Sequence, residues 1–125
     1  MIGCVILTHG DLCFGLKNTL EGMMGKQEGL LAISNLGAGK DQISLRLKKA
    51  VNEDRFKEGV VIFVDLFGSS CWQIAKNIAS QDQTVAVVCG VNLPMLVKFF
   101  SKRKTLPFEK LVPSVKEEGE KGIRS

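Results

Sequence analysis

Four short apolar runs recur along the chain, and segments with apolar residues at helical spacing separate them. The runs cover residues 1–8, 30–33, 60–64 and 84–89. They are almost continuously apolar rather than alternating, which is typical of strands that helices cover on both faces. Strands that alternate with helices predict a parallel sheet. We therefore expect an α/β fold, and a length of 125 residues predicts a single domain over 1–125.

The order of the strands follows from the handedness of their connections. Right-handed crossovers and the usual doubly wound path predict a mostly parallel four-stranded sheet in the order 2-1-3-4, with helices on both faces. The first and third strands are then neighbours, and the chain leaves them toward opposite faces. Such folds bind ligands at this switch point, outside the carboxyl ends of the strands. We expect the functional site there.

Two polar residues end these two neighbouring strands. The first apolar run ends in His9, the only histidine, and the third ends in Asp65. A carboxylate that accepts a hydrogen bond from one imidazole nitrogen fixes the tautomer and leaves the other nitrogen as a nucleophile. We interpret His9 as a catalytic nucleophile for a phosphoryl group and Asp65 as the residue that orients it. A solvated histidine and a helix-capping acid are the alternative interpretation.

Candidate phosphate-binding residues flank this pair. Gly10 follows His9, and Gly68, Ser69 and Ser70 follow Asp65, each group at the predicted start of a helix. The first amides of a helix have no partner within it, so they can bind a phosphate, and glycine allows a close backbone approach. Phosphoryl transfer needs mainly such positioning and charge compensation. Ser69 or Ser70 is also expected to cap the helix.

Several other function classes find little support. The segment Gly37-Ala38-Gly39-Lys40 lacks the Ser or Thr that would follow the lysine of a P-loop, and no dinucleotide-binding glycine pattern follows the first strand. Ser69 and Ser70 lie outside a nucleophile elbow, so a small hydrolase is a weaker alternative. We expect no metal and no bound cofactor, because the four cysteines show no metal-ligand spacing.

Charge and hydropathy argue against nucleic acid and membrane partners. The basic cluster at residues 98–104 falls at the end of an apolar helical stretch, where cations complement the helix dipole. No basic-aromatic alternation accompanies it, so we expect no nucleic-acid binding. No apolar run approaches the roughly 20 residues of a membrane span, and the start of the chain lacks the features of a signal peptide. A cytoplasmic protein is predicted.

Three segments together resemble one known family. They are Ile6-Leu7-Thr8-His9-Gly10-Asp11-Leu12, Val64-Asp65-Leu66-Phe67-Gly68-Ser69-Ser70 and Gly90-Val91-Asn92-Leu93-Pro94-Met95-Leu96. In this order, each at a strand end, they are similar to the enzyme IIA domain of the mannose family of the bacterial phosphoenolpyruvate-dependent sugar phosphotransferase system. The similarity extends in register over essentially the whole chain.

The resemblance implies a phosphoryl relay. His9 would accept a phosphoryl group from the histidine-containing phosphocarrier protein and pass it to a IIB component, which phosphorylates sugar during transport through membrane IIC and IID components. Asp65 would be the hydrogen-bond partner of His9, and Ser70 the serine near the phosphate. The resemblance also implies a homodimer, allows an extra C-terminal edge strand, and suggests a free-standing IIA component. Phe67, Leu93 and Met95 are candidate exposed residues for partner docking, with burial in the core as the alternative.

The departures from the family pattern lie close to the site. The family usually has Thr, Gly, Pro and Asn where this chain has Val64, Ser69, Cys71 and Gln73. Ser69 in place of glycine could crowd a phosphate or add a bond to it. A regulatory binding module controlled by His9 phosphorylation is an alternative function, and a relay subunit for dihydroxyacetone kinase is another.

Overall fold

The sheet of the computed structural model, which describes residues 1–125, has the predicted order and direction. Its strands are β1 (Gly3–Thr8), β2 (Leu30–Ser34), β3 (Val60–Val64) and β4 (Val85–Cys89). All neighbours pair in parallel in the order β2-β1-β3-β4. The order 2-1-3-4 and the α/β class are therefore confirmed.

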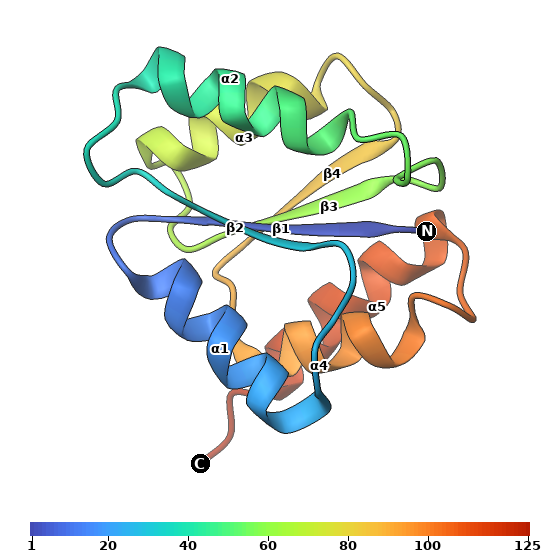
Figure 1. Ribbon diagram of the computed structural model, residues 1–125. Coiled ribbons are helices and arrows are strands. Elements are labelled where there is room, and N and C mark those ends of the chain that lie inside the picture. The colour runs from blue at the N-terminus through green and yellow to red at the C-terminus, as the bar shows by residue number, and fades with distance from the viewer.

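Helices cover both faces of this sheet, as Figure 1 shows. Helices α2 (Lys40–Val51) and α3 (Ser70–Ala79) lie on one face. Helices α1 (Leu12–Met24), α4 (Leu93–Lys102) and α5 (Phe108–Lys121) lie on the other. Within residues 1–125 no strand follows α5 and the sheet has four strands, so these residues do not form the extra edge strand. No helix is both long and apolar enough to cross a lipid bilayer.

The alternation of side chains along each strand divides the core in two. In β1, Cys4 and Ile6 belong to the cluster beneath α1, α4 and α5, whereas Val5 and Leu7 belong to the cluster beneath α2 and α3. All four are fully buried. Burial of both faces explains why the strand is apolar at successive positions. It also fixes the register, since a shift by one residue would exchange the two faces.

The ends of β1 and β3 meet at the same edge of the sheet. In their register, Leu7 lies opposite Val64, so His9 and Asp65 follow the paired segment closely on adjacent strands. The two strands then connect to helices on opposite faces, α1 and α3. The topological switch point therefore lies where the sequence predicts the functional site.

Candidate functional site: a histidine–aspartate pair at the sheet edge

Asp65 holds both the backbone and the ring of His9. Its Oδ2 accepts a hydrogen bond from the His9 backbone N–H at 3.0 Å. The His9 Nδ1 atom lies 2.9 Å from Oδ2 and 3.1 Å from Oδ1 of the same carboxylate. A carboxylate accepts hydrogen bonds only, so Nδ1 carries the proton when it donates to Asp65. This arrangement leaves Nε2 as the ring atom with a free lone pair in the neutral tautomer.

The ring is accessible while the carboxylate is largely covered. The His9 side chain is 40% exposed and the Asp65 side chain 15%. Nε2 makes no hydrogen bond within the protein, and the only partner of the ring is Asp65. Asp65 therefore orients the imidazole through Nδ1, and Nε2 stays open to a partner. A nucleophile or a proton-transfer group requires this geometry.

The turn that follows His9 is fixed by two side chains at the end of β2. The Gly10 N–H donates to Asn35 Oδ1 at 3.0 Å, and the Gly10 carbonyl accepts from the Ser34 hydroxyl at 2.7 Å. Gly10 has a φ of +59°, a conformation that favours glycine. The Gly10 amide is thus already occupied by Asn35. The sequence analysis did not assign Ser34 and Asn35 to the site, although Ser34 ends and Asn35 follows β2, a strand adjacent to β1.

The start of α3 presents a different set of groups from the one expected. The Ser69 hydroxyl donates to the Leu66 carbonyl at 2.7 Å and accepts from the Trp72 N–H at 3.3 Å, so Ser69 is the residue that caps the helix. Gly68 has a φ of +79° in the preceding turn. The Ser70 hydroxyl makes no hydrogen bond within the protein, and the Ser70 N–H lies at the first position of the helix. Of the two serines, Ser70 has the groups that are free to meet a phosphate.

Of the two thiols near the pair, Cys71 is buried and Cys89 is partly buried, and neither is reactive at neutral pH. Cys71 is fully buried at the start of α3, and burial followed by the nearby Asp65 charge raises the pKa of its thiol to about 11. Burial and Asp65 also raise the pKa of Cys89, at the end of β4. Both thiols stay protonated at neutral pH, so neither competes with His9 as a nucleophile. All four cysteines are free.

Exposed apolar side chains gather around the pair. Phe67 is 74% exposed and packs against Trp72 with ring centroids 4.7 Å apart. Leu66 and Leu36, from the loops after β3 and β2, are 62% and 58% exposed, and Leu12 at the start of α1 is 48% exposed. The segments that follow β1, β2 and β3 therefore present apolar side chains at the edge of the sheet where His9 lies, and exposed apolar surface marks protein interaction sites.

Two of the three expected docking residues do not belong to this exposed set. Met95 is 6% exposed, and its side chain packs against Gly119 of α5, so the expectation that it is exposed is wrong. Leu93 is half-buried and packs against the core cluster beneath α4. Met95 and Phe99 are four residues apart on the buried face of α4, and this helical spacing was a signal of burial.

Fold and site together define a doubly wound α/β domain whose switch point holds an accessible histidine oriented by a carboxylate. Over residues 3–116 the chain also matches the sequence profile of the family described as "PTS system fructose IIA component". The chain belongs to this family of IIA components of the sugar phosphotransferase system. IIA components are parts of a phosphotransferase, which gives the chain a general role in phosphoryl transfer.

Individual relatives agree with this assignment. The chain is 28% identical to the PTS system fructose-specific EIIA component of Bacillus subtilis (strain 168), over 93% of this chain and 80% of the relative. It is 30% identical to the PTS system mannose-specific EIIAB component of Escherichia coli (strain K12), over 99% of this chain but 39% of that longer protein. The fold superposes on the phosphotransferase system component EIIA of Streptococcus agalactiae with a TM-score of 0.92, at 23% identity, over 100% of this chain and 97% of the other.

Proposed function

We propose that residues 1–125 form one IIA domain that relays a phosphoryl group through His9. In this proposal the histidine-containing phosphocarrier protein is the donor and a IIB component is the acceptor, and the transfer is coupled to sugar uptake and phosphorylation. The observation that carries the proposal is the contact of His9 Nδ1 with Asp65 Oδ2 at 2.9 Å, which leaves Nε2 free on an accessible ring.

The chemistry assigns a role to each atom of the pair. The Nε2 lone pair attacks the phosphorus of the phosphorylated carrier, so a P–Nε2 bond forms as the P–N bond to the carrier's histidine breaks. The carrier's ring recovers the electron pair of the broken bond. Asp65 keeps the proton on Nδ1 and stabilises the positive charge that develops on the ring. In the second transfer the same steps run from His9 to the IIB component.

The phosphate-binding part of the proposal rests on four residues. We assign the Ser70 hydroxyl and N–H direct contacts with the phosphoryl oxygens, because they have no partner within the protein and lie at a helix start. Gly10 and Gly68 would shape the two turns, and Ser69 would support the site as the cap of α3. Catalysis of phosphoryl transfer is largely such positioning.

Docking of protein partners is assigned to the exposed apolar residues around His9. Phe67 is the central candidate, because it is 74% exposed and Trp72 restrains its ring from one side. Exposed aromatic anchors of this kind often carry much of the binding energy of an interface. Leu36 and Leu66 would complete the contact surface. Membrane IIC and IID components would be reached only through the IIB component, and the protein would act in the cytoplasm.

A homodimer is also part of the proposal. β4 is an edge strand, and a groove of ≈ 690 Å³ runs beside it. Nine of its 13 lining residues are apolar, among them Val85 and Val87 from the strand and Trp72 from α3. An exposed edge strand presents unpaired N–H and C=O groups that can pair with another chain. Sedimentation equilibrium should give twice the monomer mass, and Val87→Lys should reduce it to the monomer mass with the fold intact.

The decisive experiment is reconstitution of the relay. The protein is incubated with radiolabelled phosphoenolpyruvate, enzyme I and the phosphocarrier protein, and then with a IIB component. We expect an acid-labile, alkali-stable phosphate that His9→Ala abolishes and that the IIB component discharges. A protein that is phosphorylated but discharges to no IIB component would instead favour the regulatory role. A protein that stays unlabelled at His9 would refute the proposal.

A further inference from the structure

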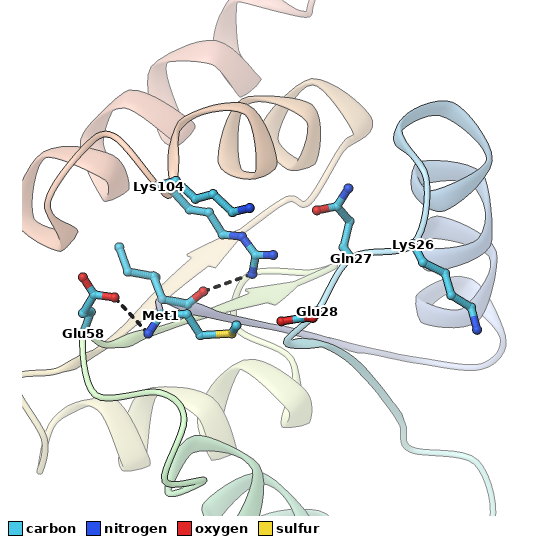
Figure 2. A pocket seen from close by; sticks show the side chains of 8 residues that line it. Met1, Lys26, Gln27, Glu28, Glu58 and Lys104 are labelled. Atoms are coloured by element: carbon cyan, nitrogen blue, oxygen red, sulfur yellow. Dashed lines mark hydrogen bonds and ion pairs between the residues drawn. The ribbon is translucent and has the colours of Figure 1, made fainter.

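A polar cavity lies at the amino ends of the strands, at the opposite end of β1 from His9. It has a volume of ≈ 510 Å³, and its lining includes Lys26, Gln27 and Glu28 from the α1–β2 connection and Arg103 and Lys104 from the segment after α4. Figure 2 shows this cavity from close by. The volume is in the range of pockets that bind small molecules, about 300–1,000 Å³. The proposed phosphoryl transfer uses none of these residues.

Arg103 is the buried cation in the lining of this cavity. It is 8% exposed, and its guanidinium lies 4.8 Å from the ring centroid of Phe100 and 5.9 Å from that of Phe99. One N–H donates to the Ile2 carbonyl at 3.3 Å. Burial lowers the pKa of Arg103, but an arginine in a protein stays charged at neutral pH. The chain therefore keeps a positive charge almost wholly buried at this end of the sheet.

This buried charge has no anionic partner within the protein. None of the ion pairs of the chain includes Arg103. The charge of Glu28 acts on it and raises the pKa of Arg103 against the effect of burial, yet Glu28 makes no hydrogen bond or ion pair with it. A guanidinium has five N–H donors, and Arg103 uses one nitrogen for its single hydrogen bond. Every fully buried side-chain nitrogen has a partner, so the remaining Arg103 nitrogens are reached by solvent, and the cavity is the space that they line.

The rest of the lining adds a second cation and polar groups. Figure 2 shows Lys104 extending across the cavity in the direction of Gln27, with Glu28 beneath it, whereas Lys26 points away at the rim. Glu58 is already paired with the Met1 amino group at 2.8 Å. A planar guanidinium matches the geometry of a phosphate or carboxylate, and a lysine adds a mobile point charge. The cavity thus offers two cations to an entering anion.

We propose that this cavity binds a small organic oxyanion whose phosphate or carboxylate group lies against Arg103 and Lys104. The Gln27 amide provides hydrogen bonds to hydroxyl groups elsewhere on the ligand. The site is separate from the phosphoryl site, because the six residues of β1 lie between them and extend over roughly 20 Å. Binding here requires neither His9 nor its phosphorylation, so the proposal can fail or succeed independently of the relay function.

The test is a titration of the whole chain with three matched probes, followed by ¹H–¹⁵N NMR. The probes are a hexose 6-phosphate, a hexonate carrying a carboxylate, and the uncharged hexose. We expect at least one of the two anions to bind with a Kd of about 1 mM or tighter and to shift the amide signals of Gln27, Glu28 and Lys104, and the uncharged hexose to shift none. No binding of either anion, or shifts confined to Gly10 and Ser70, would overturn the proposal.

Substitutions then distinguish anion binding in this cavity from nonspecific attraction of anions by the positive charge of the chain. Lys104 is exposed, so Lys104→Gln should fold normally and weaken anion binding about tenfold, the effect of losing one charge-assisted hydrogen bond. Lys49→Gln is the matched control, at a lysine on α2 that is also exposed, and should leave the affinity unchanged. Arg103→Lys keeps the charge but loses the planar fork and should weaken binding at least as much. Equal effects of Lys104→Gln and Lys49→Gln would also overturn the proposal.

Discussion

Replacing Asp65 by asparagine removes one charge from beside His9 while keeping the size of the side chain. The asparagine carbonyl can still accept the His9 backbone N–H that Asp65 Oδ2 now accepts at 3.0 Å, so we expect the turn to keep its shape. The ring loses its interaction with a negative charge, because both oxygens of the Asp65 carboxylate lie within 3.1 Å of Nδ1. An asparagine can present its NH₂ group to Nδ1, which places the ring proton on Nε2 and blocks the nucleophile.

The magnitude of the loss follows from the distance and the exposure. Unit charges about 3 Å apart interact by about 5 kcal/mol at an effective dielectric constant near 20. The His9 side chain is 40% exposed, so water screens part of this energy, and we take about 3 kcal/mol as the stabilisation of the transition state. That energy corresponds to roughly a 10²-fold slower transfer. The change of tautomer slows the transfer further. In Ser-His-Asp triads the same substitution, through the same change of tautomer, lowers kcat about 10⁴-fold.

Two measurements test this reasoning on Asp65→Asn. Rapid quenching with radiolabelled phosphocarrier protein gives the rate of transfer to His9, and long-range ¹H–¹⁵N NMR shows which ring nitrogen carries the proton. Asp54→Asn, at an exposed acid on the loop before β3, is the control and should change neither quantity. A rate within about threefold of the wild type, with Nε2 still unprotonated, would refute the role assigned to the carboxylate.

Three further substitutions test other parts of the structure. Asn35→Ala frees the Gly10 N–H and should slow transfer to His9 about tenfold in the same rapid-quench assay, because the turn loses the bond that fixes it. Folding raises the pKa of the Cys71 thiol to about 11. As the pH rises, this thiol therefore loses its proton at a lower pH in the unfolded chain than in the folded protein. The free energy of unfolding in urea should therefore fall between roughly pH 9 and 11, and less steeply in Cys71→Ala; equal slopes would contradict the assignment. Phe99 is fully buried edge-on to Phe63, and Phe99→Ala should lower the free energy of unfolding by about 3–5 kcal/mol; a loss below about 1 kcal/mol would contradict the packing.

Much of the fold could be predicted because its strongest constraint is visible in the sequence. Strands covered on both faces must be apolar at successive positions, as Val60–Val64 is, and right-handed crossovers leave few ways to order them. The same topology brings together His9 and Asp65, whose positions the sequence analysis predicted as neighbours. Their juxtaposition needs only the strand order and the register, not the details of packing.

Details that depend on the choice of hydrogen-bond partner could not be predicted. Gly10, Ser69 and Ser70 all read equally well as phosphate ligands, but Asn35 occupies the Gly10 amide and the α3 cap occupies the Ser69 hydroxyl. Local side-chain bonds of this kind compete with any ligand, and sequence spacing does not show which one forms. The burial of Met95 was different in kind, since its spacing from Phe99 on α4 could have been read as a core position.

The pairing of β1 with β3 has a consequence for the newly made chain. His9 is synthesised early, but its partner Asp65 follows β3, which cannot join the sheet until the intervening α1, β2 and α2 have been made. Parallel pairings over such separations form late and slowly. A ribosome-bound or partly collapsed chain would therefore carry a histidine that lacks its orienting group. Competence to accept a phosphoryl group would then report that the molecule has matured, which would keep unfinished copies from drawing on the cell's phosphate donors.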